Sequence, residues 1–110
     1  MFIISEVSSN IDSVGILLFD TEKELYWDNT NQVWTNTRNT LLTFFVPSIR
    51  IINSCHITKI NETKLEKSIY IAVPVDYTTG MKIGPISVIN LKGQPTAKDT
   101  VINISNYNNS

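Results

Sequence analysis

Short runs of β-branched and aromatic residues recur along this chain of 110 residues, and none of them has the spacing of an amphipathic helix. Val, Ile, Thr, Phe, Tyr and Trp dominate the runs, and these residue types fit the pleated, half-buried surface of a sheet. Several short strands separated by turns are typical of a sandwich or barrel, so we expect one small all-β domain. The predicted strands are residues 2–4, 14–19, 25–27, 33–35, 41–46, 49–52, 69–73, 82–91 and 101–104.

The alternation of apolar residues predicts how some of these runs lie in a sheet. Ile69, Ile71 and Val73 are spaced two residues apart, so they share one face of a strand. Within residues 86–91 the apolar positions shift midway from one face to the other, which predicts a β-bulge or a change of sheet after Val88. The run Leu-Leu-Thr-Phe-Phe-Val at 41–46 is apolar on both faces and predicts a central strand or one covered by a partner.

The composition argues against several classes of partner. Charged residues make up 17% of the chain and its net charge is −1, so no basic surface points to nucleic acid or an anionic membrane. No apolar stretch approaches the roughly 20 residues that span a bilayer, and no signal peptide is recognisable. The single cysteine, Cys55, cannot form a disulfide within the chain. We therefore expect a protein made in the cytoplasm, without a nucleic-acid or membrane partner.

No group of residues has the pattern of an enzyme or metal site. Cys55 and His56 are adjacent, and adjacent residues of a strand point to opposite faces, so they do not form a nucleophile and base. One histidine and one cysteine are too few for zinc. Residues 28–32, Asp-Asn-Thr-Asn-Gln, resemble a calcium loop but lack its Gly and distal Glu, so we predict a turn there. The expectation is no catalytic residue, no metal and no cofactor.

Three aromatic residues, Tyr26, Trp27 and Trp34, lie on the two arms of one predicted hairpin. Cross-strand aromatic pairs stabilise a hairpin by roughly 0.2–1 kcal/mol each. In a small sandwich one tryptophan is usually in the core and the other half-buried, so we expect a core role for these rings, and the sequence leaves open which of Trp27 and Trp34 is the exposed one. An exposed pair could instead stack on a sugar ring, so the exposure of Trp27 and Trp34 separates a core role from a carbohydrate-binding platform.

After Gly93 the chain becomes polar, and its last apolar residues are Val101, Ile102 and Ile104. We therefore place a β-sandwich domain at residues 1–93 and a polar segment at residues 94–110. This segment contains either the last strand of the domain or a strand that adds to the edge of a partner's sheet. The candidate contact residues for a partner or ligand are Tyr26, Trp27, Trp34, Val101, Ile102 and Ile104.

The hairpin and the strand before it resemble a module of structural proteins from tailed bacteriophages. In that module a Leu-Phe-Asp run leads into a Tyr-Trp-Asp-Gly turn that is followed by Trp. The matching residues here are Leu-Leu-Phe-Asp at 17–20, Leu-Tyr-Trp-Asp at 25–28 and Val33-Trp34, with the closing part of the module at 68–73 and 83–86. Asn29 stands where the module often has Gly, and Asn can replace Gly in a left-handed turn. The resemblance covers roughly residues 14–91.

This resemblance implies a small immunoglobulin-like, antiparallel β-sandwich with short loops and no catalytic residues. Such a chain would be a non-enzymatic component of the virion, as a capsid accessory, head-fibre, tail or connector protein. Its partners would be other virion subunits or further copies of itself, because a nearly uncharged surface permits dense assembly without strong repulsion. The alternatives are the carbohydrate-binding module and a small regulatory or inhibitory phage protein.

Overall fold

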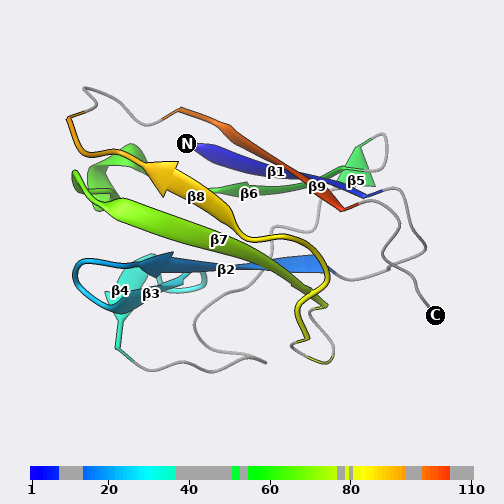
Figure 1. The fold of residues 1–110 in the computed structure, drawn as a ribbon, viewed down its shortest axis with the longest axis horizontal. Helices are drawn as coiled ribbons and strands as arrows, with labels where there is room; N and C mark the ends of the chain where they lie inside the picture. Colours follow the sequence, from blue (N-terminus) through cyan, green and yellow to red (C-terminus); the bar gives the residue numbers. More distant parts are fainter. Residues whose placement is uncertain are drawn as a thin grey trace.

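The computed structural model of the chain describes residues 1–7, 14–36, 51–52, 55–76, 79, 81–93 and 98–104, with the backbone alone for residues 7, 51–52 and 55–57. Nine strands and one short 3-10 helix are formed within these residues (Figure 1). The strands are β1 Phe2–Val7, β2 Val14–Asp20, β3 Leu25–Asp28, β4 Val33–Thr35, β5 Ile51–Ile52, β6 Cys55–Lys59, β7 Ile69–Asp76, β8 Ser87–Asn90 and β9 Thr100–Ile104, and the helix η1 is Glu62–Lys64. No helix in this part of the chain has the length and hydrophobicity needed to cross a membrane.

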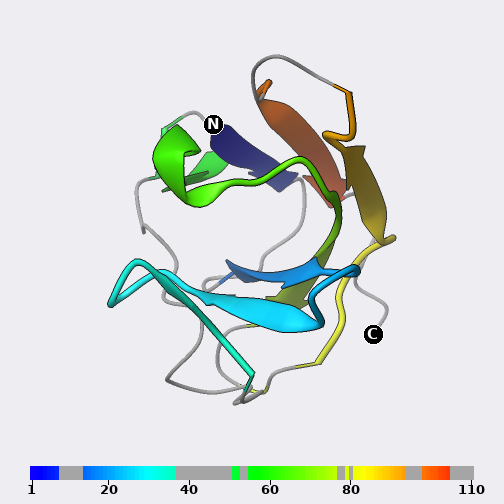
Figure 2. The same ribbon diagram turned by 90° about the vertical axis from the view of Figure 1, so that its left-hand side faces the viewer.

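The strands form two sheets that face each other across a common core (Figure 2). The smaller sheet has the order β5-β6-β1-β9, and the larger sheet has the order β4-β3-β2-β7-β8. The all-β sandwich expected from the sequence is therefore confirmed. One pairing departs from the antiparallel expectation, because β1 and β9 run parallel.

The side chains between the sheets come from alternate positions of each strand, as the period of a strand requires. Ile3 of β1, Leu18 of β2 and Ala72 of β7 have no exposed surface, and Ile89 of β8 is 7% exposed. Close packing also explains why residue 84, in the segment between β7 and β8, is a glycine. A Cβ atom added there would lie 2.9 Å from Cγ of Pro74, so only glycine lets the chain pass over that buried ring.

β9 belongs to the sandwich, although it follows the boundary that we placed after Gly93. Its residues pair with β1 from Ile3↔Thr100 to Val7↔Ile104. Ile102 and Ile104 are each 1% exposed, whereas Val101 is 51% exposed. Of the two alternatives for this segment, the last strand of the chain's own domain is the one observed, and the domain boundary at residue 93 was wrong. Residues 94–97 and 105–110 lie outside the described residues.

The register shift predicted after Val88 lies a few residues earlier in the chain. β8 pairs regularly with β7 from Ile69↔Asn90 to Ala72↔Ser87. The next pair is Val75↔Lys82, so four residues of one segment face two of the other, and the bulge falls between Lys82 and Ser87. The prediction placed it wrongly because the adjacent apolar residues Val88 and Ile89 lie on opposite faces of a regular strand, one exposed and one buried. The strand predicted at 41–46 lies outside the described residues.

Two alanine substitutions on neighbouring residues of β9 test whether this strand is part of the chain's own core. Ile102→Ala should lower the free energy of unfolding by about 2–5 kcal/mol, because it leaves a cavity between the sheets. Val101→Ala is the matched control on the exposed face, and its effect should stay within about 0.5 kcal/mol. Urea unfolding of both variants measures the difference, and equal effects would show that β9 does not pack as described.

Candidate interaction site

The two tryptophans of the β3–β4 hairpin point into the sandwich. Trp27 has no exposed surface, and Trp34 is half-buried. Their ring centroids are 5.1 Å apart and meet edge to face, while Trp34 stacks on Tyr70 at 5.4 Å. The core role expected for the tryptophans is therefore confirmed, and the fully buried ring is that of Trp27.

The indole N–H groups of both tryptophans donate hydrogen bonds that fix their rings at this end of the core. Nε1 of Trp34 donates to the carbonyl of Lys64 in η1 at 2.7 Å, and Nε1 of Trp27 donates to Oδ1 of Asn29 at 2.9 Å. A sugar platform needs open ring faces, and Trp27 offers none. The third aromatic of the hairpin, Tyr26, lies on the opposite face of its strand, where its ring contacts Phe19 at a centroid distance of 4.7 Å.

The turn between β3 and β4 is stabilised by hydrogen bonds to the carboxylate of Asp28. Oδ1 of Asp28 accepts from the backbone N–H groups of Thr30 at 3.0 Å and Asn31 at 3.1 Å, and Oδ2 accepts from the side-chain amide of Asn31 at 2.9 Å. The turn predicted at 28–32 is therefore confirmed. Its left-handed residue is Gln32, with φ 56°, and not Asn29 as the phage resemblance implied.

Metal-binding chemistry is not assembled in the part of the chain that the structure describes. No three His, Cys, Asp or Glu side chains come together there as a set of metal ligands. Cys55 and His56 lie on β6, but their side chains are outside the described residues.

Tyr70 and Asp20 tie the start of β7 to the turn after β2. The Tyr70 hydroxyl accepts from the N–H of Glu66 at 2.8 Å and donates to the carbonyl of the same residue at 2.9 Å, an arrangement known from β-sandwiches as a tyrosine corner. Oδ1 of Asp20 accepts from the Ser68 hydroxyl at 2.5 Å and from the N–H of Glu22 at 3.0 Å. Sequence reasoning missed this corner, because a tyrosine within an alternating strand carries no signal of its hydroxyl's partner.

Burial raises the pKa of Tyr70 to about 12, with a further contribution from the negative charges of Asp20 and Glu22. The hydroxyl therefore stays protonated and keeps donating its hydrogen bond well above the pH at which a free tyrosine ionises.

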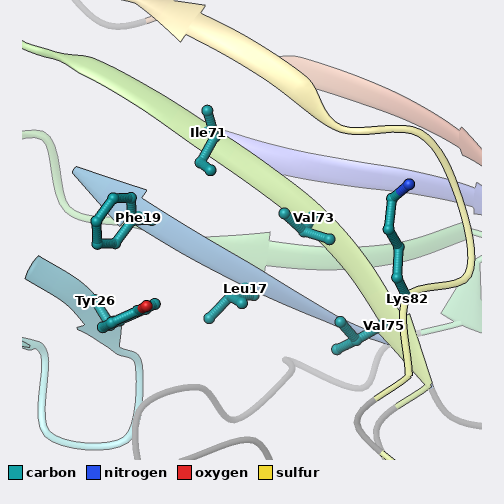
Figure 3. Close-up of a pocket in the computed structure, with 7 residues that line it drawn as sticks. All are labelled: Leu17, Phe19, Tyr26, Ile71, Val73, Val75 and Lys82. Atoms are coloured by element: carbon teal, nitrogen blue, oxygen red, sulfur yellow. The ribbon is translucent and has the colours of Figure 1, made fainter. Parts of the chain in front are cut away.

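The outer face of the larger sheet is apolar across three adjacent strands. The ladder registers place Tyr26 opposite Phe19, and Phe19 opposite Ile71, so the three side chains form one row across β3, β2 and β7. Leu17 and Val73 form the next row. We call this the outer apolar face, and its residues are Leu17, Phe19, Tyr26, Ile71, Val73 and Val75, of which Leu17 and Val75 are buried (Figure 3).

A groove of about 290 Å³ runs along this face, with Lys82 at the Val75 end (Figure 3). Phe19, Tyr26, Ile71 and Val73 are half-buried, so their rings and methyl groups keep part of their surface open. An antiparallel sheet with one face on the core ordinarily presents polar side chains on the other. β2 and β7 depart from that rule, because both of their faces are apolar.

Of this face, Tyr26 was predicted as a contact residue, and the alternation in β7 predicted only that Ile71 and Val73 share a face. The remaining signal was the run at 14–19, which is apolar at every position except Gly15 and therefore implies cover on two sides. Of the other candidate residues, the structure places Ile102 and Ile104 in the core and leaves Val101 exposed on the far sheet.

No protein-family model, curated protein or solved structure matches this chain. Its role must therefore be inferred from its own residues, and among those that the structure describes the outer apolar face is the feature that we consider further. The buried carboxylates of the described residues, Asp20 and Asp28, both accept hydrogen bonds that hold turns.

The raised pKa of Tyr70 predicts how stability depends on alkaline pH. The unfolded tyrosine ionises near its ordinary pKa of 10, and the folded one near 12, so stability is fully present below pH 10 and falls as the pH rises towards 12. The difference of about two pKa units corresponds to about 2–3 kcal/mol. Tyr70→Phe should cost about 1–3 kcal/mol at neutral pH, through the lost hydrogen bonds, but lose less stability above pH 10.

Urea unfolding of the wild type and of Tyr70→Phe at a series of alkaline pH values measures both effects. The variant serves as the reference for all other groups that titrate in this range. Parallel stability curves for the two proteins would contradict the assignment of the alkaline loss to Tyr70.

Proposed function

We propose that this chain is a non-enzymatic structural module that binds a neighbouring protein subunit through its outer apolar face. The observation that carries the proposal is the half-buried apolar surface of β2, β3 and β7, on the side of the sheet turned away from the core. Apolar surface that is contiguous and rimmed by polar groups marks interaction sites on soluble proteins. The resemblance of residues 14–91 to virion modules supplies the setting, a structural protein of a tailed-phage particle such as a capsid accessory, head-fibre, tail or connector protein.

The chemistry of the face fits a protein partner. Aromatic and aliphatic side chains are enriched in the dry centre of protein interfaces, and Phe19, Tyr26 and Ile71 supply that type of surface. The Tyr26 hydroxyl and the exposed ammonium of Lys82 lie at the margins of the groove, where a rim of polar contacts is expected (Figure 3). The partner surface should therefore be apolar at its centre and offer an oxygen acceptor or a carboxylate near Lys82.

Replacing Ile71 by lysine in the gene of the phage tests this proposal. The wild-type chain should be present in purified particles at a fixed ratio to the other virion proteins, measured by quantitative mass spectrometry. Ile71→Lys places a charge in the middle of the proposed interface, so its amount in particles should fall at least about tenfold, the effect of 1.4 kcal/mol. Val101→Lys, which adds the same charge at a 51% exposed position on the other sheet, should leave incorporation unchanged.

Three results would contradict the proposal. The chain could be absent from purified particles, which would end the virion setting. Ile71→Lys could be incorporated as well as Val101→Lys, which would remove the outer apolar face as the binding surface. Finally, the isolated chain could unfold with Ile71→Lys and also with the milder Ile71→Thr, which would make this face part of the domain's own interior. Far-ultraviolet circular dichroism of the purified variants distinguishes the last two results.

A further inference from the structure

The two sides of the sandwich end in edge strands of different lengths. On one side the edges are β4 and β5, with three and two residues, and on the other they are β8 and β9, with four and five. Figure 2 shows β8 in yellow and β9 in orange on the same side of the molecule. Short strands, charges and prolines protect sheet edges from pairing with other chains. β8, Ser-Val-Ile-Asn, has none of these protections apart from its modest length.

The backbone of β8 offers hydrogen-bonding groups at its free edge. The N–H of Leu91 donates to the carbonyl of Ser68 at 2.9 Å, towards the β7 side. Because alternate residues of an antiparallel strand bond to the same neighbour, Ile89 and Ser87 also bond towards β7, whereas Val88 and Asn90 direct their N–H and C=O groups away from it. No strand of the described residues pairs with β8 on that outer side.

The side chains at this edge are the exposed continuation of the outer apolar face. Val88 lies opposite Ile71 in the ladder, so the row of Tyr26, Phe19 and Ile71 extends to the last strand of the sheet. Val88 is 67% exposed, more than any other large apolar side chain described, and Ile86 is 50% exposed. The apolar row therefore ends on β8, the edge strand of the sheet, where its last side chain, Val88, is exposed to solvent.

We propose that β8 pairs antiparallel with β8 of a second copy of this chain, which joins the two larger sheets into one continuous sheet across a twofold axis. The pairing is self-complementary when the axis passes beside Val88. Val88 then faces its own equivalent, and Asn90 lies opposite residue 86 of the other copy, with the backbone groups of Val88 and Asn90 directed at the shared edge. The exposed valines and isoleucines of both copies form one apolar cluster on the outer face.

A second copy fits this edge because no charge opposes the approach. β8 contains no ionisable residue, and β9 on the same side, Thr-Val-Ile-Asn-Ile, contains none either. The net charge of the chain is −1, so two copies repel each other only weakly. The pairing uses the edge of the larger sheet and does not involve Phe19 or Ile71 of the outer apolar face, so it goes beyond the proposed function and can fail without it.

Sedimentation equilibrium of the purified full chain tests this pairing, over concentrations from about 1 μM to about 1 mM. The wild type should show a monomer–dimer equilibrium. Val88→Lys places two like charges directly opposite each other, and it should raise the dissociation constant at least about tenfold. Val33→Lys is the matched control, because Val33 is 45% exposed on β4 at the opposite edge of the same sheet, and this variant should dimerise like the wild type.

A wild type that remains monomeric over the whole range would overturn the inference, as would equal dissociation constants for the two lysine variants. If Val88→Lys does not fold, as judged by circular dichroism, Val88→Thr retains the β-branched shape and should still weaken dimerisation while Val33→Thr does not. A monomeric chain that nevertheless enters particles through Ile71 would refute only the β8 pairing. A dimer that is absent from particles would refute only the virion role.

Discussion

The pairing of β2 with β7 is the constraint on which the rest of the structure depends. The two strands run side by side from Val14↔Asp76 to Asp20↔Tyr70, at the centre of the larger sheet. Because side chains alternate, this one register sends Leu18 and Ala72 into the core and brings Phe19 next to Ile71 on the outside. A slip by one residue would exchange the two faces. Both faces are apolar, so the hydrophobic effect alone distinguishes the two registers poorly, and other interactions must fix the choice.

The hydrogen bonds of Asp20 and Tyr70, at one end of the β2–β7 ladder, distinguish the two registers. Asp20 and Tyr70 face each other across the pair, and both point into the core side of the sheet. Asp20 binds the Ser68 hydroxyl and the turn after β2, while the Tyr70 hydroxyl binds the backbone of Glu66. In a slipped register these groups would lie on the outside, and the donors and acceptors that they satisfy would be left unpaired. Buried hydrogen bonds thus specify a register that apolar burial by itself leaves ambiguous.

Local patterns in the sequence predicted most of the described strands and the β3–β4 turn, because alternation and turn chemistry act over a few residues, but they missed β6. They did not predict which residues meet across the sheets. Ile102 looked like a partner contact because its neighbours are polar, and its burial depends on β1, far away in the chain. Trp27 and Trp34 carry the same signal in sequence, and they differ in exposure because Trp27 lies on the inner strand β3 and Trp34 on the edge strand β4. The outer apolar face was hidden for the same reason, since it exists only once β2 and β7 are in register.

The parallel pairing of β1 with β9 joins the first and the last of the described strands. Ile3 faces Thr100, so the smaller sheet is complete only when almost the whole chain is available. Contacts between such distant residues are slow to form, because the intervening chain loses its conformational freedom before the contact stabilises it. During synthesis, β1 emerges early and can pair with β6 once residues 55–59 have followed, but its other edge stays unsatisfied until β9 leaves the ribosome. The smaller sheet is therefore most exposed to wrong pairing in the interval when β1 and β6 are present and β9 is not.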